Sequence, residues 1–155
     1  MPLERLKKFL DEHAVKYLTV KHSPAFTAQE LAALAHVPGE EWAKTVMVKL
    51  DGKIAMAVIP ASSRVVFDRL KEAAGATQAE LATEREFADL CPGCEVGAMP
   101  PFGNLFGLDT FVDEALSEDA EIVFNAGSHT EMMRLAFADY ARLAKPRVAK
   151  LTRKS

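Results

Sequence analysis

The start of the chain carries apolar residues at helical spacing. Within residues 3–14 they recur every three to four positions, with charged residues between them, which predicts an amphipathic helix. Two capping-box patterns, at residues 27–30 and 83–86, predict the starts of further helices. Ser62 or Ser63 is expected to cap another helix that ends at Gly75. Helices are thus expected at residues 3–14, 28–37, 64–74, 84–90 and 136–144.

Short β-prone runs separate these helices. Strands are expected at residues 16–21, 45–50, 54–59, 110–112, 121–124 and 131–135. Asp51-Gly52 lies between two of these runs and is a strong hairpin signal. Residues 91–107 are rich in Gly and Pro, so we expect a loop there, with at most short pieces of strand. Interleaved strands and helices with one antiparallel hairpin favour a mixed sheet over a doubly wound parallel one.

Length and composition set the class of protein. A chain of 155 residues has the size of one domain, residues 1–155. The longest strictly apolar run spans only residues 54–61, whereas a membrane-spanning helix needs about 20 residues. The N-terminus is charged throughout and has no apolar signal region. With two cysteines and no export signal, we expect a cytoplasmic protein in a reducing environment.

The net charge of −3 hides an asymmetry. Residues 1–139 contain 13 Lys or Arg against 22 Asp or Glu, a balance of −9. Residues 140–155 contain six basic residues and no acid, and the basic C-terminal tail is assigned to residues 145–155. Two interpretations stay open: a solvated, frayed tail, or a tail that contacts phosphates.

Common catalytic signatures are absent from the sequence. There is no G-x-S-x-G, no P-loop, no Rossmann glycine pattern and no H-E-x-x-H. The pair Cys91 and Cys94 has no second C-x-x-C and no paired His with which to complete a zinc site. It precedes a Gly/Pro-rich loop instead of opening a helix, which argues against a thioredoxin-like redox motif and favours a structural role. No metal and no cofactor are expected.

Three places could still carry chemistry. The first is Lys44, because a lysine near an apolar strand face is costly unless it meets an anion or reaches water at the strand end. The second is the segment of residues 97–103, either a rigid connector or a loop that presents backbone N–H groups to an oxygen. The third is the turn at residues 125–129, either a plain hairpin turn or part of a substrate pocket.

These segments, in this order, resemble a known family. The residues that carry the likeness are Ala43-Lys44-Thr45-Val46, the segment 94–103 with its Gly97-Ala98-Met99-Pro100-Pro101 core, and Asn125-Ala126-Gly127-Ser128-His129. The run that begins with His22-Ser23-Pro24 is similar to the N-terminal region of the same family. The chain is identified from these motifs as resembling the YbaK/prolyl-tRNA-synthetase-associated editing domains, over roughly residues 15–144.

The resemblance implies a fold and roles for individual residues. The implied fold is an α/β (α+β) domain with a mixed, strongly curved sheet of about six to seven strands surrounded by short helices. The resemblance gives catalytic roles to Lys44, Gly97 and Pro101. It gives substrate-binding roles to His22, Thr45, Val46, Ala98, Met99, Pro100, Phe124, Gly127, Ser128 and His129. Family members need no metal.

The implied activity is that of a trans-editing aminoacyl-tRNA deacylase. It would hydrolyse the ester of a mischarged tRNA that carries a small amino acid, with Ala or Ser favoured and proline tRNA as a candidate carrier. The expected partners are the aminoacylated 3′ end of a tRNA and, in addition, an aminoacyl-tRNA synthetase, and we expect a monomer. The alternative is a non-catalytic module of the same fold that binds a tRNA end or a synthetase.

Overall fold

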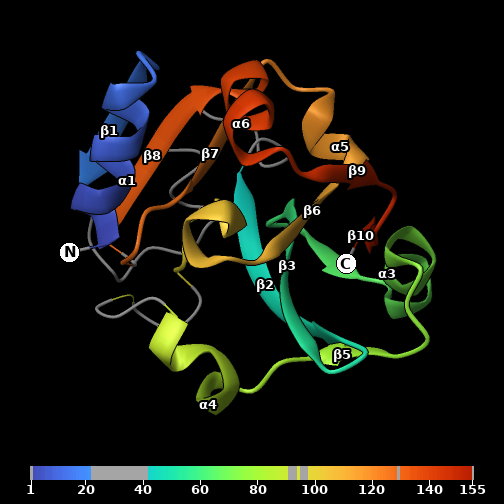
Figure 1. Cartoon of the computed structure of the whole chain (residues 1–155). Coiled ribbons are helices and arrows are strands. Elements are labelled where there is room, and N and C mark those ends of the chain that lie inside the picture. The colour runs from blue at the N-terminus through green and yellow to red at the C-terminus, as the bar shows by residue number, and fades with distance from the viewer. Residues whose placement is uncertain (1, 22–41, 91–93, 95–97, 129, 155) are drawn as a thin grey trace.

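A computed structural model describes residues 2–21, 42–90, 94, 98–128 and 130–154 (Figure 1). The helix predicted at residues 28–37 lies outside these ranges. The remaining four predicted helices and all six predicted strands fall within the described ranges.

A five-stranded mixed sheet forms the centre of the described part of the fold. Its strand order is β5 (Ala79–Leu81), β2 (Ala43–Leu50), β3 (Lys53–Pro60), β6 (Asp109–Asp113) and β9 (Arg147–Ala149). The pairs on the β5 side of β3 are antiparallel, and the pairs β3–β6 and β6–β9 are parallel. Asp51 and Gly52 join β2 to β3 with φ values of 49° and 85°. This is the geometry of a tight hairpin turn, so the predicted hairpin is confirmed.

A second sheet packs beside the first. It has the order β1 (Tyr17–Lys21), β8 (Glu131–Ala136) and β7 (Glu121–Asn125), and both pairs are antiparallel. Trp42, just before β2, forms an isolated parallel bridge with Val123 of β7. This bridge places the beginning of β2 next to the turn that follows β7.

Short helices lie around the two sheets (Figure 1). The helices are α1 (Pro2–Glu12), α3 (Phe67–Ala74), α4 (Glu84–Phe87), α5 (Glu114–Ser117) and α6 (Phe137–Ala144), with 3-10 turns at Ala88–Leu90 and Gly103–Phe106. The capping box predicted at Thr83 and Glu86 is present, and Gly75 ends α3 in the left-handed conformation with φ 68°. In the described part of the chain, no helix is long and apolar enough to cross a membrane.

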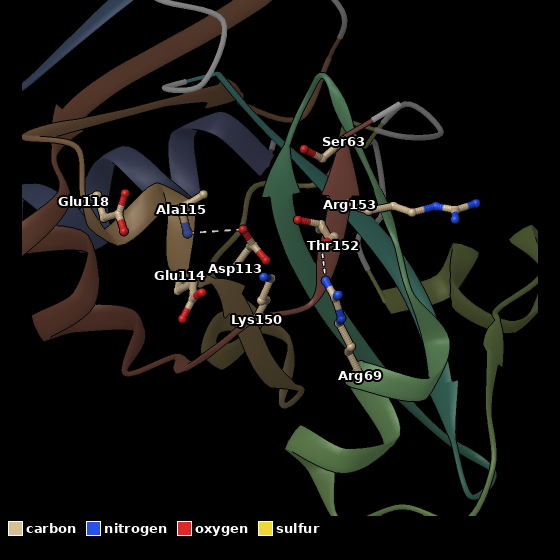
Figure 2. Close-up of a pocket in the computed structure, with 9 residues that line it drawn as sticks. All are labelled: Ser63, Arg69, Asp113, Glu114, Ala115, Glu118, Lys150, Thr152 and Arg153. Atoms are coloured by element: carbon tan, nitrogen blue, oxygen red, sulfur yellow. Dashed lines mark hydrogen bonds between the residues drawn. The ribbon is translucent and has the colours of Figure 1, made fainter.

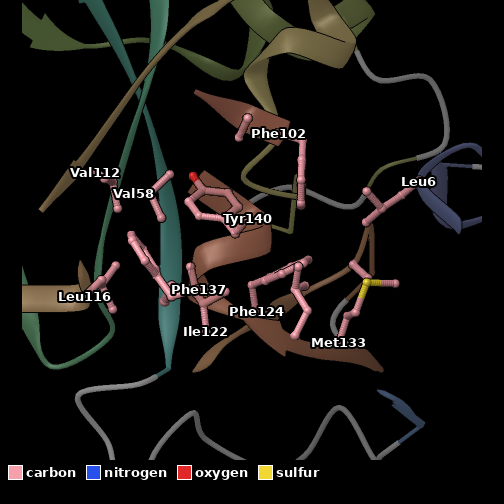
Figure 3. Packing of buried hydrophobic residues seen from close by; sticks show 14 of the residues in the cluster. Leu6, Val58, Phe102, Val112, Leu116, Ile122, Phe124, Met133, Phe137 and Tyr140 are labelled. Atoms are coloured by element: carbon pink, nitrogen blue, oxygen red, sulfur yellow. The ribbon is translucent and has the colours of Figure 1, made fainter. Parts of the chain in front are cut away.

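The main hydrophobic core lies between the two sheets, α1 and α6 (Figure 3). Phe102 is fully buried at its centre, with edge-on ring contacts to Phe124 at 5.9 Å and to Tyr140 at 5.2 Å between centroids. A second cluster, which includes Val48, Ile59, Leu70 and Leu151, fills the space between the five-stranded sheet and α3. The core therefore fixes the segment that leads into Phe102.

The structure confirms the mixed α+β class but shows more strands than expected. The described residues form ten strands in three hydrogen-bonded sheets, rather than about six to seven in one. All six predicted strands are present. The additional strands β4 (Ser63–Val65), β5, β9 and β10 (Thr152–Lys154) have three residues each. Such short strands depend on a partner from elsewhere in the chain and carry little local signal.

The beginning of one predicted helix and one interpretation of the C-terminal tail were wrong. Ser63 belongs to the strand β4 instead of capping a helix, and α3 begins only after Val66. The frayed alternative for the C-terminal tail is also wrong, because β9 pairs with β6 and β10 pairs with β4. Leu151 between them is fully buried in the second cluster. This apolar anchor and the two strand pairings attach the end of the chain to the body.

Candidate functional site

Lys44 lies near the beginning of β2, opposite Ile59 of β3. Side chains alternate between the two faces of a strand, so Lys44 shares a face with Val46 and Val48. Both valines pack in the second hydrophobic cluster. Lys44 is exposed at the end of this row, a position from which a lysine can keep its ammonium group in water.

The electrostatic surroundings of Lys44 disfavour its charge. Although the residue as a whole is exposed, partial desolvation of the ammonium group, and in addition the positive charge of Arg64, lower the pKa of Lys44 below its usual value. Among the described residues, no carboxylate forms an ion pair with Lys44. A cation in this position gains free energy from an external anion.

Lys49, on the same strand, has the opposite surroundings. Its ammonium nitrogen Nζ lies 2.6 Å from Glu86 and 3.6 Å from Glu80. These carboxylates, the hydrogen bond to Glu86 first, raise the pKa of Lys49. Of the two lysines of β2, Lys49 is therefore part of a surface ion-pair network, and Lys44 is the one without a described counter-ion.

The described part of the predicted loop, residues 98–101, is buried along its whole length. Met99 packs against Met47 and Met56 on the face of the sheet opposite to Lys44. The hydroxyl of Tyr140 donates a hydrogen bond of 2.9 Å to the carbonyl oxygen of Pro101. The core therefore holds this segment in one position. Gly97, the first residue of the motif, lies outside the described residues.

A backbone hydrogen bond joins this loop to the predicted turn after β7. The N–H of Gly127 donates to the carbonyl oxygen of Ala98 at 2.7 Å. Gly127 has a φ of 97°, a conformation that glycine adopts readily and other residues rarely adopt. Ser128 is half-buried, and its Oγ lies 3.1 Å from the Oγ1 of Thr130. Two segments that are far apart in the sequence thus meet at Ala98 and Gly127. His129 lies outside the described residues.

Other predicted site residues occupy different places. Phe124 is 1% exposed and lies in the main core, and Val46 packs against the second cluster. Thr45, half-buried, alternates with Lys44 and so lies on the face that Met99 covers. His22 lies outside the described residues. The structure therefore brings together Ala98, Met99 and Gly127, and it leaves the Lys44 side chain on the other face of β2.

A pocket of about 380 Å³ lies away from these residues, between α5 and the pair β4–β10 (Figure 2). Acidic and basic side chains line this pocket, and two of them, Asp113 and Arg69, already have hydrogen-bond partners within the protein. The carboxylate of Asp113 accepts hydrogen bonds from the N–H of Leu151 at 2.8 Å and of Ala115 at 3.2 Å. Arg69 donates to the carbonyl oxygen of Thr152 at 2.6 Å. These bonds attach the C-terminal segment to the body.

The sequence does not identify Arg64 as a neighbour of Lys44. Arg64 was predicted to lie in a helix, whereas it lies in β4 opposite Arg153 of β10. Arg153 itself was only counted within the basic tail. No local pattern could have joined these two positions, because more than half of the chain separates β4 from β10.

The described residues provide no group of three or more His, Cys, Asp or Glu side chains that could hold a metal ion. Cys94 is disulfide-bonded. The sequence predicted a reducing environment for the two cysteines. Cys91 lies outside the described residues. A disulfide-bonded sulfur is not available as a thiolate ligand or nucleophile.

Comparisons with known proteins agree on one family. The sequence model of the aminoacyl-tRNA editing domain matches residues 22–143. The chain is 28% identical over 155 residues to the multifunctional Ser/Thr-tRNA deacylase ProXp-y of Escherichia coli (strain K12), covering 97% of this chain and 92% of that protein. It is also 27% identical over 89 residues to a proline–tRNA ligase of Bacillus mycoides (strain KBAB4), of which it spans only 16%.

A solved structure shows the same fold. The crystal structure of a protein proposed as a trans-editing enzyme for prolyl tRNA synthetase superimposes with a TM-score of 0.84 at 19% identity, covering 98% of this chain and 97% of that one. Since the family model covers most of the chain and includes Lys44, the segment 97–101 and the turn 125–129, the chain belongs to the aminoacyl-tRNA editing domain family.

Proposed function

We propose that this protein is a free-standing aminoacyl-tRNA deacylase that hydrolyses the ester of a mischarged tRNA carrying a small amino acid. The observation that carries the proposal is Lys44, a partly desolvated cation beside Arg64 with no described carboxylate partner. Such a cation suits the terminal phosphate of an RNA strand. Lys44 and Met99 lie on opposite faces of β2, which favours a role in anchoring the phosphate over a role in polarising the ester carbonyl.

The segment 97–101 is the proposed oxyanion site. Pro100 and Pro101 have no N–H to donate, so the donors are the backbone groups of Gly97, Ala98 and Met99. Among the described residues, the N–H groups of Ala98 and Met99 donate to no backbone carbonyl. A fixed donor of this kind stabilises a developing oxyanion by about 3 kcal/mol. The bonds to Gly127 and Tyr140 hold the segment in place.

The reaction needs few ionisable side chains. A water molecule adds to the ester carbonyl carbon, and the carbon–oxygen bond to the ribose then breaks. The adjacent ribose hydroxyl of the tRNA, directly or through a water that it holds, takes the proton from the attacking water and passes one to the departing ribose oxygen. The products are the free amino acid and the uncharged tRNA.

The substrate is proposed to be a seryl or alanyl ester, with proline tRNA as a candidate carrier. The name of the Escherichia coli relative, a Ser/Thr-tRNA deacylase, supports a seryl ester first. The likeness to part of a proline–tRNA ligase supports the link to proline tRNA and to its synthetase as a partner. The protein would act in the cytoplasm as a monomer.

A panel of mischarged tRNAs tests the proposal. We expect the wild-type protein to accelerate loss of a small aminoacyl group. Lys44→Ala should lower kcat/KM by about 10- to 100-fold, the equivalent of one charge-assisted hydrogen bond. Lys49→Ala is the matched control, because it removes the same charge from the same strand and should leave kcat/KM close to the wild-type value.

Two results would count against the proposal. If no small aminoacyl ester is hydrolysed faster than in buffer, the protein is a binding module of the same fold. If Lys44→Ala deacylates at the wild-type rate, Lys44 does not anchor the substrate.

A further inference from the structure

Two arginines face each other across the short ribbon formed by β4 and β10. Arg64 is the direct register partner of Arg153. The flanking residues Ser63 and Thr152 are buried, at 5% and 8% exposure. Because side chains alternate along a strand, both arginines project from the opposite, exposed face. Like charges at directly opposed positions of an antiparallel pair destabilise the pair.

No described anion compensates these two charges. Lys49, Lys71, Arg134 and Arg142 each form an ion pair with a carboxylate, whereas neither Arg64 nor Arg153 does so with any described residue. Figure 2 shows the Arg153 side chain extending from β10 away from Asp113, Glu114 and Glu118. The arrangement costs free energy in the isolated protein, and this cost would disappear on binding a polyanion.

The ribbon is continuous with the site of Lys44. Lys44 lies opposite Ile59, β3 ends at Pro60, and β4 begins at Ser63. The charge of Arg64 acts on Lys44 strongly enough to contribute to its lowered pKa. Arg153 then lies one strand further along the same exposed surface. Lys44, Arg64 and Arg153 are thus consecutive cations that lead away from the beginning of β2.

We propose that Lys44, Arg64 and Arg153 form one phosphate-binding track that holds the backbone of the RNA strand leading to the aminoacylated end. The inference rests on the proposed function and extends it from the terminal phosphate to the phosphates before it. Guanidinium groups suit this role, because they bind phosphate oxygens in a bidentate manner. The balance of −9 over residues 1–139 opposes binding elsewhere on the body, so the track sets the direction in which the RNA leaves the site.

The experiment measures binding of an uncharged RNA hairpin that mimics a tRNA acceptor stem with its single-stranded 3′ end. Fluorescence anisotropy gives the dissociation constant at several salt concentrations for the wild type and for Arg64→Gln, Arg153→Gln and the double variant. The logarithm of the association constant falls linearly with the logarithm of the salt concentration. Each lost contact should make this slope less steep by about 0.7, and the double variant should make it less steep by about 1.4. Arg85→Gln is the matched control, because Arg85 is exposed on α4, which lies far from the C-terminus in Figure 1. It should keep the wild-type slope.

Thermal unfolding separates a binding defect from a folding defect. Removing one of two opposed like charges should leave the melting temperature unchanged or raise it, while the affinity for RNA falls. If the double variant has the same salt slope as the wild type, or if Arg85→Gln lowers the slope equally, the track is overturned.

A substrate without a phosphate backbone distinguishes this inference from the proposed function. The wild type and the double variant should hydrolyse an aminoacyl-adenosine at equal rates, while the double variant should be about tenfold slower on the full mischarged tRNA at low substrate concentration. If the wild type hydrolyses neither substrate, the proposed function fails. The salt dependence of RNA binding then still tests whether Arg64 and Arg153 contact phosphates. If the double variant is equally slow on aminoacyl-adenosine, the arginines act on the ester site itself and the track is wrong.

Discussion

Replacing Tyr140 with phenylalanine tests whether the core holds the proposed oxyanion segment. Tyr140 is fully buried, and burial raises the pKa of its hydroxyl well above the usual value, so the group is a proton donor at any physiological pH. It donates to the carbonyl oxygen of Pro101 at 2.9 Å. Tyr140→Phe keeps the ring contacts with Phe102 and Phe137 and removes this one bond (Figure 3).

The structure sets the expected magnitude. The Pro101 carbonyl is buried, and a buried acceptor that loses its partner costs about 1–3 kcal/mol. At about 2.1 cal/mol/K of unfolding entropy per residue, a chain of this length should lose about 3–9 °C in melting temperature. The segment 98–101 should also become less fixed, so kcat for deacylation should fall more than KM rises.

Tyr17→Phe is the matched control, since Tyr17 is the other tyrosine of the chain. Its hydroxyl donates to Asp11 at 3.1 Å on the surface. A surface substitution of this kind changes stability by about 0.5 kcal/mol or less. Calorimetry and single-turnover deacylation would be compared for both variants. If Tyr140→Phe destabilises the protein no more than Tyr17→Phe, the bond to Pro101 does not hold the segment. An unchanged kcat in a destabilised Tyr140→Phe would show that the position of the segment is not catalytic.

Three further outcomes follow from single contacts. The hydrogen bond from Lys49, together with the hydrogen bonds from Thr83, lowers the pKa of Glu86 from 4.5 to about 2. The stabilisation by this carboxylate is therefore complete above about pH 4.5 and is lost as the pH falls toward 2, and Glu86→Gln should flatten this part of a stability–pH curve. Asp113→Asn leaves one acceptor oxygen where the carboxylate has two, at a cost of about 1–3 kcal/mol, and amide hydrogen exchange should rise at Leu151 first. Gly103→Ala would place a Cβ 2.8 Å from a backbone carbonyl oxygen and should destabilise by about 1–3 kcal/mol in urea titrations; a variant as stable as the wild type would show that this turn relaxes freely.

Parts of the fold could be predicted because their signals are local. Asp51-Gly52 supplies the positive φ angles of the hairpin turn by itself. Thr83 and Glu86 close a capping box within four residues. The predicted strands were recognised because each carries its own β-prone run. The helix predicted before Gly75 is present, but its predicted beginning was wrong, because residues 63–65 pair with a strand from the far end of the chain. A pairing of that kind overrides local propensity.

Some residues of the candidate site could be named from the sequence, but their arrangement in space could not be predicted. The family motifs gave Lys44 and the segment 97–101 as functional candidates. Alternation along β2 could not decide which lysine is neutralised, because Glu86 comes from a helix more than thirty positions away. The bond between Gly127 and Ala98 likewise depends on how the core orients two separate segments.

The sequence by itself determined the mixed α+β class, the position of the hairpin and the motifs of an aminoacyl-tRNA editing domain. These depend on turn chemistry, hydrophobic period and motif order, each of which is contained in a few neighbouring residues. The tertiary structure alone decided that the basic C-terminal segment forms two strands, which pair with β6 and with β4, and that Arg153 lies opposite Arg64. The physical reason is that long-range packing sets both the strand register and the residues that lie next to a charged side chain. Here the packing of Leu151 in the second cluster and its hydrogen bond to the carboxylate of Asp113 set them.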